Sequence, residues 1–188
     1  MIPGEADSLQ REKQRLRREI RTAASSLTEE YRAEASRRIT AQVLALEVYR
    51  KARVVMVFVS LPEEPDTREI IRDAVRAGKT VLLPRCVDKK RMVALPFAGW
   101  ESLVPGWMDI PEPREPAEGT EVPDPELILA PCVTVSPDGR RLGHGAGYYD
   151  RFLAGREAKT VCLCYRQLTR EDVPTGPLDR RMDQVITD

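Results

Sequence analysis

Apolar positions recur at two different spacings along the chain, and each spacing predicts one type of element. Over residues 7–25 the apolar side chains repeat every three or four positions, which is the pattern of an amphipathic helix. Asp7, with Gln10 three residues later, fits a capping pair at the start of this helix. A second amphipathic helix follows directly, so residues 7–48 are expected to form a helical N-terminal arm packed on the rest of the chain.

Beyond this arm the apolar residues form short continuous runs, which are typical of strands covered on both faces. Residues 53–60 and 79–84 flank a helix predicted over 67–78, and this order indicates a right-handed βαβ unit. Further strands are expected at 92–97, 127–133, 159–165 and 183–187. The first of these contains Pro96, which cannot donate to a ladder, so it is predicted to be an edge strand.

The alternation of strands and helices predicts an α/β fold. No internal repeat or linker interrupts the chain, so residues 1–188 are expected to form a single domain. We expect a three-layer sandwich in which a mostly parallel or mixed central sheet is flanked by helices.

The charge balance narrows the possible partners. The 188 residues carry 30 acidic and 30 basic side chains, so neither a nucleic acid nor a membrane surface is an expected partner. No apolar run approaches the roughly 20 residues of a membrane span, and residues 1–7 lack the apolar core of a signal peptide. We therefore expect a cytoplasmic protein. The composition leaves the oligomeric state open, with a monomer as the expectation.

The four cysteines are Cys86, Cys132, Cys162 and Cys164. They form no C-x-x-C pair, and the only histidine, His144, lies in a glycine-rich stretch, so the spacing of a zinc site is missing. The sequence predicts buried, reduced thiols that act as small apolar side chains.

The glycine-rich stretch spans residues 139–151, with Gly143, Gly145 and Gly147 in alternate positions. A short helix is predicted over 148–154. Glycines let the backbone approach a ligand closely, and a loop that leads into a helix directs N–H groups outward, which suits a phosphate. A flexible surface turn is the alternative. The spacing matches neither the P-loop pattern nor the dinucleotide-binding pattern.

Charged residues elsewhere offer possible partners for this loop. Lys13 and Arg17 project toward the apolar side of the first helix, where a basic side chain either extends along the core surface or reaches a buried anion. Glu63 and Glu64 follow the strand predicted at 53–60, and ligands of such sheets bind at the carboxyl ends of strands. An acidic loop that is only solvated is the alternative.

The stretch 139–151, Gly-Arg-Arg-Leu-Gly-His-Gly-Ala-Gly-Tyr-Tyr-Asp-Arg, closely resembles the signature of the 5-formyltetrahydrofolate cyclo-ligases, also called 5,10-methenyltetrahydrofolate synthetases. The resemblance covers nearly the whole chain. It includes Lys13-x-x-x-Arg17, the loop at 60–67, Ile-Pro-Glu-Pro at 110–113 and the closing Met-Asp-Gln-Val-Ile-Thr at 182–187.

The resemblance implies an enzyme that converts 5-formyltetrahydrofolate to 5,10-methenyltetrahydrofolate, with ATP and Mg²⁺, and that releases ADP and phosphate. By matching position, ATP would contact Lys13, Arg17, Arg141, Leu142, Gly143, His144, Gly145, Ala146, Gly147, Tyr148 and Tyr149. The reduced folate would contact Val59, Glu64, Met108 and Tyr148. Asp150 and Asp183 would hold the metal, and Arg141 and Lys13 would be catalytic.

The implied chemistry suits these residue types. The formyl oxygen attacks the γ-phosphate to give an iminium phosphate, and addition of N10 then expels phosphate. Phosphoryl transfer requires positioning and charge neutralisation, which Arg141, Lys13 and Arg17 would supply. Glu64 would accept hydrogen bonds from the N–H groups of the pterin.

Two positions differ from the family pattern or vary within it. Position 146 is alanine where some relatives carry lysine, and His144 occupies a variable position from which it would only touch the nucleotide. The sequence also leaves open whether Trp107 or Met108 faces the folate.

Two other functions are considered. One is a non-catalytic binder of folate or nucleotide, and the other is an isomerase or transferase of a phosphorylated sugar with His144 as its base.

Overall fold

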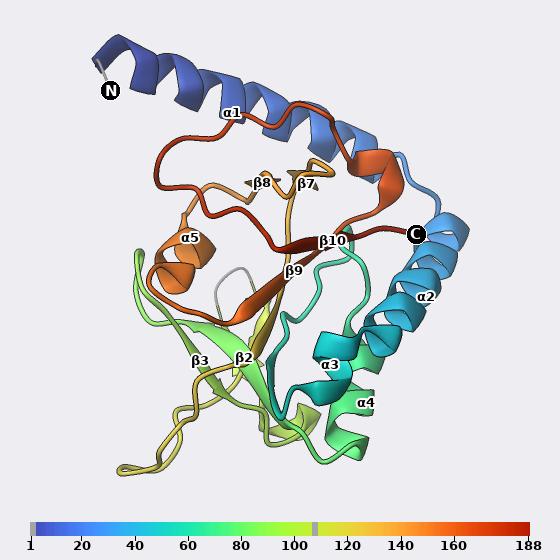
Figure 1. The fold of residues 1–188 in the computed structure, drawn as a ribbon, viewed down its shortest axis with the longest axis vertical. Helices are drawn as coiled ribbons and strands as arrows, with labels where there is room; N and C mark the ends of the chain where they lie inside the picture. The colour runs from blue at the N-terminus through green and yellow to red at the C-terminus, as the bar shows by residue number, and fades with distance from the viewer. Residues whose placement is uncertain (1–2, 107–108) are drawn as a thin grey trace.

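The computed structural model describes residues 3–106 and 109–188 and centres on a six-stranded sheet in the order β10-β9-β6-β1-β2-β3 (Figure 1). The strands are β1 (Val54–Met56), β2 (Thr80–Cys86), β3 (Met92–Pro96), β6 (Leu127–Ala130), β9 (Lys159–Leu163) and β10 (Gln184–Ile186). Neighbouring strands are parallel except β2 and β3, which pair antiparallel. The predicted α/β sheet and its proline-containing edge strand are therefore confirmed.

Helices flank this sheet, as the sequence predicted. They are α1 (Pro3–Ser25), α2 (Glu29–Ala45), α3 (Glu47–Lys51), α4 (Arg68–Arg76) and α5 (Tyr148–Leu153). In Figure 1, α2, α3 and α4 gather on one side of the sheet and α5 lies on the other, while α1 crosses one end beside the C-terminal segment. Within the described residues, no helix combines the length and the apolar character needed to cross a bilayer.

The two long helices begin differently from each other. α1 starts before Asp7, which lies inside the helix and pairs with Arg11, so the predicted capping pair is wrong. α2 begins with a true cap, because the Thr28 hydroxyl oxygen accepts a hydrogen bond from Tyr31 N at 3.1 Å. The first turn of a helix has N–H groups with no partner in the helix, and a short polar side chain satisfies one of them.

The apolar run at 53–60 is a strand only in its first part, where β1 lies. The last ladder bond of β1 runs from Val57 N to Leu82 O at 2.9 Å, and beyond it Phe58 O accepts a hydrogen bond from the Thr67 hydroxyl at 2.6 Å. Thr67 precedes α4 but makes no side-chain cap, because its hydroxyl is used in this way. These bonds hold the loop after β1 at the carboxyl end of the sheet.

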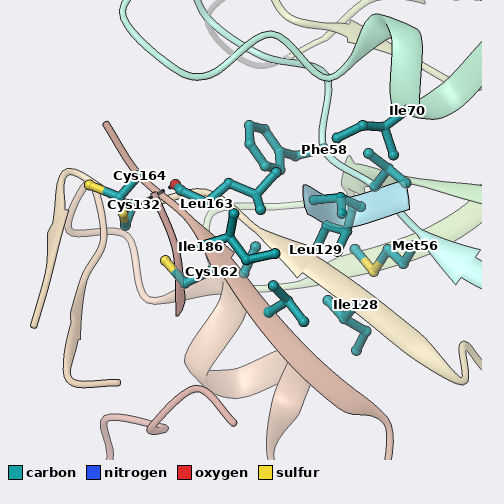
Figure 2. Close-up of a cluster of buried hydrophobic side chains, with 14 of the residues drawn as sticks. Met56, Phe58, Ile70, Ile128, Leu129, Cys132, Cys162, Leu163, Cys164 and Ile186 are labelled. Atoms are coloured by element: carbon teal, nitrogen blue, oxygen red, sulfur yellow. Dashed lines mark hydrogen bonds between the residues drawn. The ribbon is translucent and has the colours of Figure 1, made fainter. Parts of the chain in front are cut away.

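The core fills the space between the sheet and its helices, and Figure 2 shows part of it. Side chains from β1, β6, β9, β10 and α4 meet there, among them Met56, Ile70, Ile128, Leu129, Leu163 and Ile186. Cys132, Cys162 and Cys164 are buried in the same cluster, and no cysteine forms a disulfide. Cys86 is only half-buried, so the prediction of buried thiols holds for the other three.

Several short elements were not predicted. α3 follows α2 directly, and two small antiparallel pairs form: β4 (Val104–Pro105) with β5 (Pro111–Glu112), and β7 (Thr134–Val135) with β8 (Arg141–Leu142). The turn of the second pair contains Gly139 with φ of 86°, where a Cβ atom would lie 2.3 Å from Met182 O. The second pair matters for function because β8 carries an arginine from the glycine-rich stretch.

Candidate active site

A cavity of about 320 Å³ lies among α1, the loop after β1, the β2–β3 hairpin and the glycine-rich loop before α5. Of the residues predicted for the site, its lining includes Lys13, Arg17, Val59, Glu64 and every residue from 141 to 150. Asp183 is not part of the lining, and Met108 lies outside the described residues. Segments far apart in the sequence are thus brought together as expected.

The glycine-rich loop is held against the N-terminal helix. Arg17 Nε donates to Gly143 O at 2.7 Å. Gly145 and Gly147 have φ of 115° and 69°. Residues with a Cβ atom rarely adopt these values, so glycine is required at both positions. Arg17 of α1 thus contacts the loop directly, and this contact fixes one wall of the cavity.

Arg141 is a rigid cation in the wall of the cavity. Its side chain is 4% exposed, Nη1 donates to Pro131 O at 3.1 Å, and Nη2 donates to Asp150 Oδ1 at 3.2 Å. The guanidinium carbon lies 5.4 Å from the ring centroid of Tyr149. Arg141 Nε is buried without a hydrogen-bond partner, so the arginine retains an unused donor.

Lys13 pairs with Asp179, a residue that the sequence analysis did not single out. Lys13 Nζ lies 2.5 Å from Asp179 Oδ2, and the two side chains are 12% and 18% exposed. Asp179 also accepts a hydrogen bond from Gly176 N. Lys13 therefore does more than cover core surface, because a partly buried cation is held by a carboxylate at the cavity wall.

Arg17 lies in the same electrostatic environment. Burial lowers its pKa, and repulsion by Arg21 lowers it further, while Asp179 and Asp150 raise it. The guanidinium stays charged at neutral pH because arginine titrates far above it. A cation that has lost part of its hydration gains from an anionic ligand, so this part of the cavity favours phosphate or carboxylate groups.

Glu64 is a buried carboxylate in the lining of the same cavity. Its Oε2 accepts a hydrogen bond from Leu61 N at 2.9 Å, and its Oε1 lies 3.1 Å from His144 Nε2. The Glu64 carbonyl accepts from the Tyr165 hydroxyl at 2.9 Å, which fixes the backbone. The lining also includes the apolar side chains of Val59 and Leu61 from the same loop. A planar ligand with N–H donors fits such an environment.

The comparisons with known proteins agree with this geometry. The model of the 5-formyltetrahydrofolate cyclo-ligase family matches residues 9–188. The chain belongs to this family. It is 29% identical to the 5-formyltetrahydrofolate cyclo-ligase of Mus musculus, over 93% of this chain and 92% of the mouse protein. It is 30% identical to that of Mycolicibacterium smegmatis, over 72% and 73%.

Solved structures give the same result. The 5,10-methenyltetrahydrofolate synthetase of Aquifex aeolicus superposes with a TM-score of 0.79 at 26% identity, over 92% of this chain and 88% of that chain. The synthetase of Mycoplasma pneumoniae has a TM-score of 0.73, over 94% and 98%. Its identity of 19% supports the fold alone.

The two aspartates expected to hold the metal lie in different surroundings. Asp150 lines the cavity, and both of its hydrogen bonds within the described chain, from Arg141 Nη2 and Arg180 N, end on Oδ1. Asp183 Oδ2 accepts from Thr160 N and from the Thr160 hydroxyl, each at 2.8 Å. Thr160 lies near the start of β9, and the cavity lies at the other ends of the strands. The structure thus brings Asp179, rather than Asp183, into the same cavity wall as Asp150.

Two aromatic residues complete the cyclo-ligase signature. The Tyr148 hydroxyl donates to Asp88 O at 2.8 Å, which ties α5 to the β2–β3 hairpin. Tyr149 is half-buried, but its hydroxyl is fully buried and has no hydrogen-bond partner. Burial, followed by the charge of Glu64, raises the pKa of Tyr149 well above its ordinary value. This phenol stays protonated at neutral pH and can act only as a hydrogen-bond donor or acceptor.

Sequence reasoning missed several residues of the lining, among them Gln10, Cys86, Met92, Glu112 and Asp179. Gln10 lies one turn before Lys13, so its helical position could have identified it. Burial, followed by the charge of Glu112, raises the pKa of the Cys86 thiol, which is therefore a poor nucleophile. Nothing in the local pattern indicates that Glu112 or Asp179 faces the cavity.

Proposed function

We propose that the protein converts 5-formyltetrahydrofolate to 5,10-methenyltetrahydrofolate and uses ATP to do so, with release of ADP and phosphate. Membership of the cyclo-ligase family supports the conversion. The observation that carries the ATP requirement is one cavity lined by the cationic side chains of Arg141, Lys13 and Arg17 and by the buried carboxylate of Glu64. We propose that the cations form one end of the site and that Glu64 belongs to the other.

The cationic end is proposed to hold the phosphates. Arg141 is fixed by Pro131 and Asp150 and keeps an unused Nε donor, so it would meet the γ-phosphate without reorganisation. Lys13 and Arg17 extend from one face of α1 toward the same loop. The backbone of residues 143–147 can approach the phosphates closely because glycine occupies alternate positions.

The apolar end is proposed to hold the pterin. Glu64 would accept hydrogen bonds from pterin N–H groups, with Val59 and Tyr148 against the rings. His144 Nε2 lies 3.1 Å from Glu64 Oε1, an atom that the pterin would also contact. Because His144 lies between two glycines of the loop, its displacement requires only a local backbone change, and folate binding would alter the loop that meets ATP. The predicted contact of Met108 with folate stays a prediction.

The chemistry requires two steps. The formyl oxygen bonds to the γ-phosphorus while the bond to ADP breaks, which gives an iminium phosphate. N10 then bonds to the formyl carbon and loses its proton, and the carbon–oxygen bond breaks with its electron pair on phosphate. The residues supply no covalent bond in either step. They orient the two substrates and neutralise charge, as in other phosphoryl transfers.

The site fits Mg²⁺, which is a family expectation. Asp150 keeps Oδ2 without a hydrogen-bond partner among the described residues and lines the same cavity as Asp179. No group of three or more His, Cys, Asp or Glu in the described ranges is arranged to hold a metal. Mg²⁺ commonly uses one or two carboxylates plus phosphates and water, and when bound it would neutralise phosphate charge. We propose Asp150 and Asp179 as its carboxylates, with Asp179 in place of the Asp183 that the family resemblance implies.

The experiment is a turnover assay of the purified wild-type protein with 5-formyltetrahydrofolate, ATP and Mg²⁺, followed by the absorbance of the methenyl product. We expect product formation that stops when ATP is omitted. Binding of folate or ATP by calorimetry without turnover would instead identify a non-catalytic binder and contradict the proposal.

We also propose that the protein is a cytoplasmic monomer, and that residues 7–48 form an arm on a single domain.

A further inference from the structure

In the described part of the chain, two buried polar side-chain atoms lack any hydrogen-bond partner, and both belong to one stacked pair. They are Arg141 Nε and the Tyr149 hydroxyl oxygen. A buried donor without a partner is costly, and nearly all such groups in native proteins are satisfied. Both residues line the cavity, so the missing partner is expected to be a group of the bound substrates.

The position of Tyr149 relates it to both ends of the cavity. Its ring lies against Arg141, and His144 of the same loop lies 3.1 Å from Glu64 Oε1. Glu64 belongs to the proposed pterin end, and Arg141 belongs to the proposed phosphate end. The formyl group is the part of the folate that must meet the γ-phosphate, so it lies where these two ends join.

Other interpretations of the tyrosine are less consistent with these observations. A tyrosine that only fills the core would have a satisfied hydroxyl, as Tyr165 and Tyr49 do. The contact of the Tyr149 ring with the Arg141 guanidinium also places the tyrosine beside the proposed phosphate site.

We propose that the Tyr149 hydroxyl donates a hydrogen bond to the oxygen that joins the formyl carbon to phosphorus. This inference rests on the proposed function. When N10 has bonded to the formyl carbon and released its proton to solvent, the carbon–oxygen bond breaks and its electron pair moves onto this oxygen, which departs with phosphate. The tyrosine keeps its proton throughout and stabilises the charge that develops on the oxygen.

Removal of the hydroxyl by Tyr149→Phe tests this role, with Tyr49→Phe as the matched control. The Tyr49 hydroxyl is also buried, but it donates to Asp73 Oδ1 at 2.7 Å and does not line the cavity. Each change therefore removes one buried phenolic oxygen. The Tyr49 oxygen has a hydrogen-bond partner, and the Tyr149 oxygen has none.

The two variants should behave in opposite ways. Tyr149→Phe should lower kcat about tenfold to hundredfold, leave both KM values within about threefold, and leave Tm unchanged or higher. Tyr49→Phe should leave kcat unchanged and lower Tm by about 2–6 °C, because a satisfied bond is lost. This split between kcat and Tm is not expected of a structural tyrosine.

Two results would overturn the assignment. One is a kcat of Tyr149→Phe within about twofold of the wild type. The other is a loss of Tm as large as that of the control, with kcat and KM changed together, which would make the hydroxyl a structural partner. The wild-type assay is read first: if it yields no methenyl product, the proposed function is wrong and the role of Tyr149 falls with it.

Discussion

Asp179 and Asp183 lie four positions apart in the C-terminal segment, and their replacement by alanine should affect different properties. Asp179 lines the cavity and pairs with Lys13. Asp183 bonds to Thr160 and lies outside the cavity lining. We expect Asp179→Ala to raise the Mg²⁺ requirement of the enzyme and Asp183→Ala to lower only its stability.

The magnitudes follow from the contacts. Asp183→Ala removes two hydrogen bonds of 2.8 Å from a largely exposed carboxylate, so the free energy of unfolding should fall by about 1–2 kcal/mol. For a chain of this size that corresponds to a decrease of about 2–8 °C in Tm. Asp179→Ala removes a carboxylate beside the proposed metal and phosphates, which should raise the Mg²⁺ concentration for half-maximal activity about tenfold or more.

The assay titrates Mg²⁺ at saturating ATP and folate for the wild type and both variants. A second measurement compares Tm with and without Mg²⁺ and ADP, because a ligand that binds only the folded state raises Tm. This rise should be smaller for Asp179→Ala and unchanged for Asp183→Ala. The reverse pattern, with the Mg²⁺ requirement raised only by Asp183→Ala, would refute the assignment and restore the prediction made from the sequence.

Three other substitutions test the remaining parts of the account. Arg141→Ala should lower kcat about hundredfold or more with an unchanged circular dichroism spectrum, and unchanged turnover would exclude its role at the phosphate. His144→Ala should lower the KM for folate about two- to tenfold because Glu64 loses a competing partner, whereas a higher KM would mean that His144 itself binds the substrate. A hydrogen bond from Ser136 and a neighbouring arginine lower the pKa of Asp138 from 3.8 to about 2. The contribution of the Asp138 carboxylate to stability should be complete above pH 3.8 and lost as pH falls toward about 2. Asp138→Asn should therefore lower Tm near neutral pH and leave Tm unchanged in acid. An equal change in Tm at neutral and acidic pH would contradict this.

The periodic parts of the chain were the predictable ones. The stripe on α2 and the apolar runs of β2, β3, β6 and β9 depend on local burial, which alternation and helical spacing report directly. Strand ends were less accurate: β1 stops early because Phe58 O bonds to the Thr67 hydroxyl, and such a side-chain partner leaves no local pattern.

The site was predictable where a dense local motif exists. The glycine loop, Arg141 and Lys13 were all found because their residue types are unusual for their positions. The role of Asp179 could not be read in the same way. Asp179 lies in a segment without helix or strand, so no periodicity indicates whether Asp179 or Asp183 faces the cavity.

The central claim is that ATP activates the formyl oxygen itself. The most direct test uses 5-formyltetrahydrofolate that carries a heavy oxygen isotope in its formyl group, with wild-type protein, ATP and Mg²⁺, and determines the label in the released phosphate by mass spectrometry. We expect each phosphate released with methenyl product to carry the label. Unlabelled phosphate, with the heavy isotope recovered in water, would contradict it.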